Sequence, residues 1–187
     1  MNLGMEKRER SSRLIPIIIV FCIFLVFFII QVMGPILLPS GSINDLSGLS
    51  GVSDNDHEIN NISSPWNSIY SIGDRLCHQK CDRSFFINEN QMPFCARCTS
   101  IWLGILIGIG FMLFFRIPLD KRFLIIILIG LIPIGIDGFG QLLGFWESNN
   151  ITRFVTGILI GFISGISIGI IIDEFSDIII LIKTKTK

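Results

Sequence analysis

Residues 76–99 read L-C-H-Q-K-C-D-R-S-F-F-I-N-E-N-Q-M-P-F-C-A-R-C-T, and this stretch holds most of the reactive side chains of the chain. It contains four of the five cysteines, as a C-x3-C pair followed by a C-x2-C pair, and one of the two histidines. Two cysteine pairs separated by 13 residues have the spacing of a thiolate metal site or of a disulfide-bonded knuckle. The stretch ends where a long apolar segment begins, so we expect it to lie beside a membrane.

The composition of the 187-residue chain favours a membrane protein. Half of its residues are apolar, 16% are charged, and the mean hydropathy is +0.67. The formal net charge is zero, so the chain has no basic field that would favour nucleic acid. We therefore expect the lipid bilayer as a partner, and no nucleic acid.

Four long apolar segments predict four transmembrane helices. The first, residues 14–33, has 20 residues without a formal charge, enough for a helix to cross about 30 Å of hydrocarbon. A cleaved signal peptide is the competing interpretation, but the length of the apolar core favours an uncleaved anchor. The other spans are residues 99–115, 123–146 and 154–172. The fold class that we expect is an all-α membrane protein with a Cys/His-containing loop between helices 1 and 2.

The segments between and around these spans differ in composition. Residues 39–65 are rich in Ser, Asn, Asp and Gly without periodicity, which is typical of a flexible linker. We divide the chain into a tail (1–13), a first transmembrane helix acting as signal anchor (14–38), the linker (39–65), a Cys/His loop with an interfacial helix (66–98), a three-helix transmembrane bundle (99–182) and a second tail (183–187).

The Cys/His loop itself shows a helical pattern followed by a turn. A stripe at helical spacing predicts an interfacial helix with Trp and Tyr at headgroup level and two thiols on one face. Its members are Trp66, Ile69, Tyr70, Gly73, Cys77 and Cys81. Residues 83–94 then predict a short hairpin or knuckle that turns at residues 88–90, Asn-Glu-Asn.

Glycines recur at every fourth position in the later spans, which lets helix backbones approach closely. Short connecting loops predict that the three helices pack antiparallel as neighbours. The last stripe is sufficient for this packing but can equally serve a homo-oligomer. The glycines are Gly104 and Gly108, Gly140 and Gly144, and finally Gly157, Gly161, Gly165 and Gly169.

The distribution of basic residues predicts the orientation in the membrane. Ten of the 15 Lys and Arg residues lie in the two tails and the loop 116–122, which share one side of a four-span arrangement. The positive-inside rule therefore predicts a multi-pass protein of the cell membrane with both termini in the cytoplasm and the Cys/His loop outside.

Polar residues gather near the outer ends of the last two spans. Asp137 is the only formal charge in residues 123–146, and Gln141 lies one turn further along the same helix face. Ionisable residues inside a membrane mark functional sites, so the candidate catalytic residues are Asp137, Gln141, Glu147 and Arg153. The alternative is that Asp137 pairs with Arg97 or Arg153 and only fixes helix register. Glu147 and Arg153 can equally form a solvated ion pair.

Three motifs resemble a family of small prokaryotic multi-pass membrane proteins of unknown function. They are C-H-Q-x3-R-S-F from Cys77, M-P-F-C-A-R-C-T up to Thr99, and I-D-G-x2-Q-x2-G-x2-E-S-N-N-x2-R-x2-T-G up to Gly157. The family pattern has Thr-Gly where this chain has Thr-Ser, and it often has proline at the position of Cys81. The resemblance implies that the shared set is Cys77, His78, Cys95 and Cys98, and that these positions form one site. It implies no activity.

Three kinds of chemistry fit the cysteine stretch. The first is a metal site, structural or catalytic, for which zinc is the expected cofactor. Its candidate ligands are Cys77, His78, Cys81, Cys95 and Cys98. The second is thiol–disulfide exchange, because a C-x2-C pair at a helix N-terminus beside an arginine has lowered thiol pKa values. The third is a pair of structural disulfides in an oxidising compartment.

Overall fold

The computed structural model describes the backbone of residues 2–185 and the side chains of residues 13–183. Its elements are α1 (Asn2–Leu37), α2 (Asp56–Asn60), α3 (Trp66–Leu76), the short 3-10 turn η1 (Cys81–Arg83), β1 (Ser84–Ile87), β2 (Asn90–Cys95), α4 (Ala96–Phe114), α5 (Lys121–Leu142) and α6 (Asn150–Lys185). Four helical segments are long and apolar enough to cross a membrane: Arg13–Leu37, Ala96–Phe114, Lys121–Leu142 and Asn150–Lys183. The predicted four-span, mainly helical fold is therefore confirmed, and a small two-stranded sheet is added to it.

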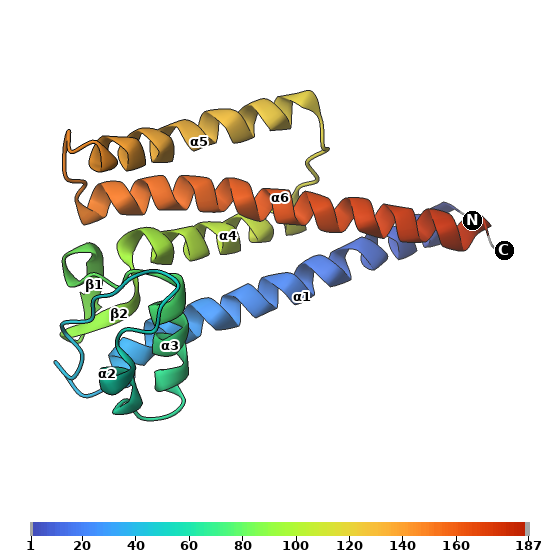
Figure 1. Ribbon diagram of the computed structural model, residues 1–187. Coiled ribbons are helices and arrows are strands. Elements are labelled where there is room, and N and C mark those ends of the chain that lie inside the picture. The colour runs from blue at the N-terminus through green and yellow to red at the C-terminus, as the bar shows by residue number, and fades with distance from the viewer. Residues whose placement is uncertain (1, 186–187) are drawn as a thin grey trace.

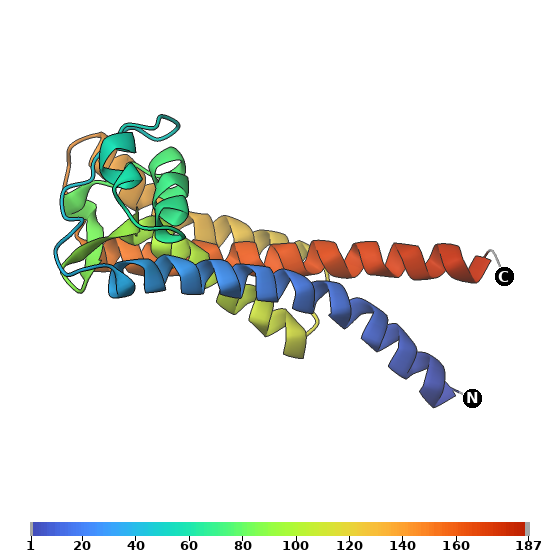
Figure 2. The same ribbon diagram turned by 90° about the horizontal axis from the view of Figure 1, so that it is seen from below.

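The four long helices form a bundle that carries a small folded unit at one end. We call residues 38–95, which contain α2, α3, β1 and β2, the head. Figure 1 shows the head beside the end of α1 and the starts of α4 and α6. Figure 2 shows the start of α1 and the end of α6 at the opposite end of the molecule. The reactive residues of the head are thus far from both ends of the chain.

Helices α4 and α6 run parallel and are the most closely packed of the described helices (Figure 1). A Cβ added to Gly104 would stand 2.5 Å from the carbonyl oxygen of Ile158 on α6. A Cβ added to Gly161 would meet the carbonyl oxygen of Ile101 on α4. The two backbones are therefore in direct contact, which only glycine allows and which gives close dispersion contact without large side chains.

The glycine stripe of α6 is thus used inside the chain. Gly157 faces Ser100, and Gly169 faces Met112. The expected antiparallel packing of consecutive helices is found for α5 and α6 (Figure 1), but the tightest pair is the parallel pair α4 and α6. Of the two uses expected for the stripe Gly157, Gly161, Gly165 and Gly169, the structure shows packing within the chain, against α4.

Helix α5 lies on the outer side of α6, with well-formed caps at both ends (Figure 1). The Asp120 side chain accepts a hydrogen bond of 2.9 Å from the Phe123 N–H at its start. At its end Gly144 has a φ of 73°, and the Phe145 N–H donates to the Gly140 carbonyl over 2.9 Å. This is a Schellman ending, and it stops the helix before the predicted residue 146.

The segment 39–65 is packed into the head and is not the flexible linker expected from its composition. Four of its apolar residues, Ile43, Leu46, Ile59 and Ile62, are each at most 7% exposed and share one core with Tyr70 and Phe94. They form two separate pairs and so give no continuous periodic pattern. Packing against the hairpin therefore orders a segment that composition predicts to be loose.

Two buried amide side chains of the hairpin hold this segment. Asn90 accepts a 3.1 Å hydrogen bond from the Ile43 N–H, and its amide nitrogen donates to the Pro35 carbonyl over 3.0 Å. Gln91 accepts from the Leu46 N–H over 2.9 Å and donates to the Leu46 carbonyl over 3.1 Å. Both side chains are 0% exposed, so these bonds replace water for an otherwise irregular backbone.

The predicted hairpin is confirmed and turns through two residues. Asn88 and Glu89 have φ angles of 53° and 59°, as in the type I′ turns that match the twist of paired strands. The stripe that starts at Trp66 forms α3 but ends at Leu76, so Cys77 is extended and Cys81 lies outside the helix. Tyr70 is 0% exposed and donates to the Gln91 carbonyl over 2.7 Å, so it is a core residue and not a headgroup anchor.

The two expected tails are helical where the structure describes them. Helix α1 already begins at Asn2, and α6 continues to Lys185. Residues 1 and 186–187 lie outside the described part of the chain. Glu, Lys and Arg dominate the first tail, and these residues have good helix propensity, so the helix extends beyond the apolar span.

The variant Gly161→Ala tests the backbone contact between α4 and α6. Its Cβ would meet the Ile101 carbonyl, so we expect a loss of about 1–3 kcal/mol of stability from overpacking. Thermal unfolding in detergent measures this loss. Gly138→Ala is the matched control, because no heavy atom lies within 4 Å of a Cβ there. Equal melting temperatures of the two variants would contradict the packing.

Candidate functional site

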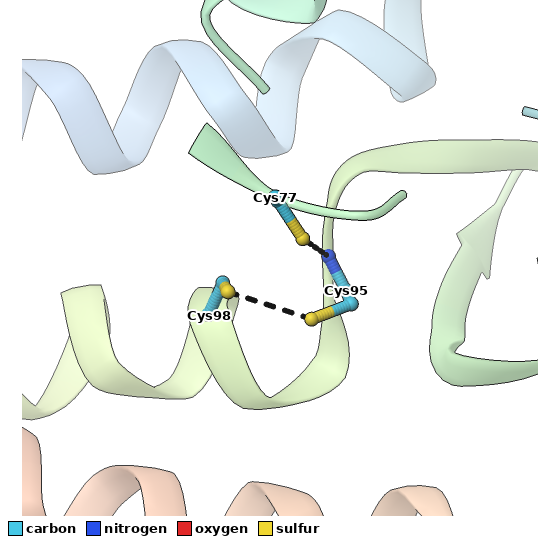
Figure 3. Close-up of side chains that lie close together, drawn as sticks. All are labelled: Cys77, Cys95 and Cys98. Atoms are coloured by element: carbon cyan, nitrogen blue, oxygen red, sulfur yellow. Dashed lines mark hydrogen bonds between the residues drawn. The ribbon is translucent and has the colours of Figure 1, made fainter. Parts of the chain in front are cut away.

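Three of the cysteines meet where the head joins α4. The sulfur atoms of Cys77, Cys95 and Cys98 all lie within 4.8 Å of one another. Cys77 follows the end of α3, Cys95 is the N-cap of α4, and Cys98 lies in the first turn of α4. Figure 3 shows the Cys95 and Cys98 sulfurs facing each other, 3.5 Å apart. The C-x2-C spacing at a helix start produces this proximity, and the fold of the head adds the third thiol.

The contacts of Cys77 tie the head to this helix start. Its side chain is 3% exposed and belongs to the same core as Tyr70 and Phe94. The Cys95 N–H donates to the Cys77 sulfur over 3.3 Å (Figure 3). Backbone N–H groups that donate to thiolate sulfur orient metal ligands and stabilise their charge. This N–H donor favours a charged Cys77 sulfur, but the pKa of Cys77 is raised overall, mainly by its side-chain hydrogen bond with Cys95.

Hydrogen bonding separates the pKa values of the two cysteines that lie outside the spans. The Cys77 thiol shares a hydrogen bond with Cys95, which raises the pKa of Cys77 and lowers the pKa of Cys95. The Cys98 side chain and the backbone N–H groups of Cys98 and Arg97 lower the pKa of Cys95 further. Cys95 is therefore the thiolate of the group, at the positive end of a helix.

The spacing of the sulfurs fits a tetrahedral metal ion. Zinc–sulfur bonds of about 2.3 Å place two thiolates of a tetrahedron about 3.8 Å apart. The observed separations, 3.5 Å for one pair and at most 4.8 Å for the others, are close to that edge. The Cys95–Cys98 separation is well beyond the ~2.05 Å of a disulfide bond, and the structure describes all five cysteines as free.

Two of the five predicted ligands are not in this group. The Cys81 sulfur donates to the Asn44 carbonyl over 3.2 Å, and His78 is exposed. The chain turns away after Cys77 because Gln79, with a φ of 42°, points into the head. Its amide nitrogen donates to the Tyr70 and Pro93 carbonyls. Of the set implied by the family resemblance, the structure brings the three thiols together and leaves the imidazole outside.

A polar cluster lies beside the thiols, between α4, α5 and α6. Arg97 forms an ion pair with Asp137, which is 4% exposed. The Gln141 amide donates to the same carboxylate over 3.1 Å. The Arg153 guanidinium donates to Gln141 Oε1 over 3.5 Å and to Asn150 Oδ1 over 3.0 Å. Three of the four candidate catalytic residues, Asp137, Gln141 and Arg153, are therefore brought together.

The fourth candidate, Glu147, is exposed in the loop between α5 and α6. Among the described residues it makes no ion pair with Arg153, so the expected solvated pair is corrected. Arg153 is itself only 6% exposed, because the start of α6 packs against the head. The pairing of Asp137 with Arg97, expected as one of two alternatives, is confirmed, and Asn150 joins the cluster as a neighbour of Arg153. Only the tertiary contacts show that Arg97, and not Arg153, is the partner of Asp137.

Comparison with known proteins gives the family context of these residues. The family model described as "Predicted membrane protein (DUF2085)" matches residues 77–172. The chain is 43% identical to an uncharacterised protein of Methanocaldococcus jannaschii over 100 residues, which cover 50% of this chain and 62% of that protein. It is 37% identical to an uncharacterised protein of Methanothermobacter thermautotrophicus over 86 residues, which cover 46% of this chain and 78% of that protein. No solved structure matches it.

The chain therefore spans less than two thirds of the first of these relatives. The matched family region, residues 77–172, begins at Cys77 and contains all three clustered thiols. It also contains the polar cluster from Arg97 to Arg153. The region that is similar to other proteins is thus the region that holds both groups of residues.

The ion pair between Arg97 and Asp137 can be tested with a double-mutant cycle. Asp137→Asn leaves the Arg97 guanidinium without its carboxylate, and we expect a loss of about 1–3 kcal/mol. The double variant Arg97→Gln with Asp137→Asn removes both charges, and we expect it to regain part of that loss. Unfolding midpoints in detergent give the comparison, with Glu147→Gln as the exposed control. If the loss of stability in the double variant equals the sum of the losses in the two single variants, the two side chains do not interact.

Proposed function

This chain belongs to the DUF2085 family of predicted membrane proteins, and we propose that its head carries a zinc site made by Cys77, Cys95 and Cys98. The observation that carries the proposal is the convergence of three sulfurs, from two segments of the chain, within 4.8 Å. Cys95 and Cys98 are separated by only two residues in the sequence, but Cys77 precedes the hairpin and is distant from them in the sequence. Such convergence of thiols is typical of zinc knuckles.

The ligand type favours zinc over the harder cations. Thiolates select soft or borderline metals, whereas magnesium and calcium take oxygen ligands. The lowered pKa of Cys95 supports binding, because a metal takes the thiolate and not the thiol. Three thiolates leave the fourth position of a tetrahedral zinc for water or another donor. A site of this kind can therefore hold a small ligand as well as the metal.

We assign the metal a role in holding the head on the bundle. Cys77 is buried in the head core, and Cys95 and Cys98 belong to the first turn of a membrane-spanning helix. A metal bound to all three would fix the distance between these parts. The Asn90 side chain already connects the head to the end of α1, and the metal would add a connection to the start of α4.

Thiol–disulfide exchange is a second candidate function, and one specific observation favours it. Cys95 is the N-cap of α4, it carries the lowered pKa, and its sulfur is 3.5 Å from that of Cys98. Closing the Cys95 thiolate and the Cys98 thiol to a disulfide would release one proton and two electrons, and an acceptor such as a membrane quinone would have to take the two electrons. A helix start with a C-x2-C pair suits such chemistry.

We further propose that the head lies outside the cytoplasm. The basic residues at the opposite end of the bundle support this orientation. Arg13 and Arg116 at that end form ion pairs with Asp177, and Arg116 also pairs with Asp173. An external location would expose the thiols to oxidants unless a metal protects them.

The zinc site predicts a defined metal content. Protein purified without chelator should contain about one zinc per chain, and each of Cys77→Ser, Cys95→Ser and Cys98→Ser should lose it, because one thiolate fewer weakens binding strongly. Elemental analysis beside a thiol count makes the measurement. Cys81→Ser, His78→Ala and Cys22→Ser are the controls, and we expect them to keep the metal.

The same measurement separates zinc from redox chemistry. Metal-free protein in which Cys95 and Cys98 are joined by a disulfide would reject the zinc site and favour thiol exchange. Metal-free protein with all thiols reduced would reject the zinc site as well. If the wild type contains metal and all three serine variants retain it, the metal is bound at another site.

The orientation predicts the behaviour of reporter fusions. Alkaline phosphatase, which is active only outside the cytoplasm, should be active when inserted after Val52 in the head and inactive when fused after Lys187. Val52 is 47% exposed in a surface segment of the head, so an insertion there should be tolerated. The reverse pattern of activity would place the head in the cytoplasm.

A further inference from the structure

The polar cluster holds a buried arginine without a carboxylate partner. Arg153 is 6% exposed, and its guanidinium donates to two neutral amide oxygens, those of Gln141 and Asn150. Within the described residues no carboxylate lies at salt-bridge distance from it. Asp137 is already paired with Arg97. Buried charges are normally paired, so the position calls for an anion.

The surroundings of Arg153 add positive charge. Arg97 and Arg83 are both near enough for their charges to act on Arg153. The Asn150 amide donates to the Ser84 carbonyl over 3.2 Å, and this contact brings the start of β1 to the start of α6. Arg83, the residue before Ser84, pairs over 3.5 Å with Asp82, whose side chain is 71% exposed. The cluster thus contains three guanidinium groups but only two carboxylates, those of the buried Asp137 and the exposed Asp82.

The buried Nε–H of Arg97 has no acceptor, and the buried Nε of Arg83 has only the 3.5 Å ion pair with Asp82. The side chains of Arg83 and Arg97 are 41% and 26% exposed, so other parts of both can be approached from outside. Arginine is the residue best suited to hold phosphate, because its planar fork matches two phosphate oxygens. The cluster therefore presents partly exposed arginine side chains together with an excess of positive charge.

The depth of the cluster narrows the choice of anion. Arg97 and Arg153 lie in the first turns of two candidate spans, and Asp137 and Gln141 lie near the end of a third. Phe145 and Trp146, 73% and 45% exposed, follow that end, as aromatic residues do at a membrane interface. The cluster is thus level with the zone where phospholipid phosphates lie. Basic pockets between spans at this level bind lipid headgroups.

We propose that Arg83, Arg97 and Arg153 form a binding site for a phosphate group at the membrane interface. Arg83 and Arg97 donate hydrogen bonds to the phosphate oxygens, and the more deeply buried Arg153 adds positive charge to the site. Asp137 and Gln141 position Arg97 and Arg153. The group belongs to an anionic phospholipid or to a soluble phosphate, since both offer the same oxygens. This site is separate from the three thiols and does not depend on a metal.

The experiment measures bound lipid on the full chain. The protein is equilibrated in mixed micelles containing equal amounts of phosphatidylglycerol and phosphatidylcholine, and native mass spectrometry counts the lipids retained. We expect wild type to retain phosphatidylglycerol in preference to phosphatidylcholine. Arg83→Gln should reduce this preference by about tenfold, as expected for loss of a hydrogen bond to a charged group. Arg153→Gln should also reduce the preference, because it removes a positive charge from the site. Arg122→Gln, at the far end of α5, removes the same charge and should leave the preference unchanged.

A second arm identifies the source of the phosphate. Inorganic phosphate is added to the wild type in the same micelles. Displacement of phosphatidylglycerol shows that the phosphate group alone is recognised, and retention of the lipid shows that the lipid is the ligand. Either result supports the site. Wild type with no lipid preference and no thermal stabilisation by phosphate overturns it.

Because Arg83 is about half exposed, Arg83→Gln should fold and can test the site even if other variants do not fold. If Arg153→Gln fails to fold, Arg83→Gln carries the comparison, because its side chain lies at the surface of the head. Arg75→Gln is then the matched control, since Arg75 is an exposed head arginine that contacts Ser53. Equal lipid preference in Arg83→Gln, Arg75→Gln and wild type overturns the assignment.

Discussion

The direct backbone contact between α4 and α6 is the constraint on which the rest of this structure depends. Gly104 and Gly161 leave no room for a side chain between the two helices. Ser100 is accommodated on the same helix face because its hydroxyl donates to the Arg97 carbonyl over 2.8 Å and because Gly157 lies opposite. The two helices therefore start at the same level, and their first turns are held side by side. The three clustered thiols and the polar cluster consist of residues that lie on those first turns or contact residues that do.

Two chemically different groups lie around the start of α4. Successive residues of a helix point about 100° apart, so Arg97 and Cys98 face different neighbours. Cys95 and Cys98 face the head and meet Cys77, whereas Arg97 turns toward α5 and pairs with Asp137. The proposed zinc site thus joins the head to the bundle, and the polar cluster joins α4, α5 and α6. A buried ion pair is weak evidence for stability, but it specifies which helices meet and in which register.

The head is stabilised by buried amides as much as by apolar packing. Asn90, Gln91 and Gln79 are 0% exposed, and their side chains bind backbone groups of segments that have no regular structure. The hairpin turn was predictable, because Asn-Glu-Asn between two short extended runs is a local signal. The packing of residues 39–65 was not, because its buried apolar residues form no continuous periodic pattern and its polar partners lie about 45 positions away in the sequence.

The sequence by itself determined the four spans, the hairpin and the cysteine pairs, since each depends on neighbouring residues and on local periodicity or spacing. It also identified Asp137 and Gln141 as an unusual polar pair inside an apolar segment. The tertiary structure alone decided which thiols converge, since Cys77 and Cys81 are separated by the end of α3 and by the turn at Gln79. It also decided that Arg97 pairs with Asp137 while Arg153 has no carboxylate partner among the described residues. Those outcomes depend on contacts between helices distant in the sequence, which local patterns do not encode.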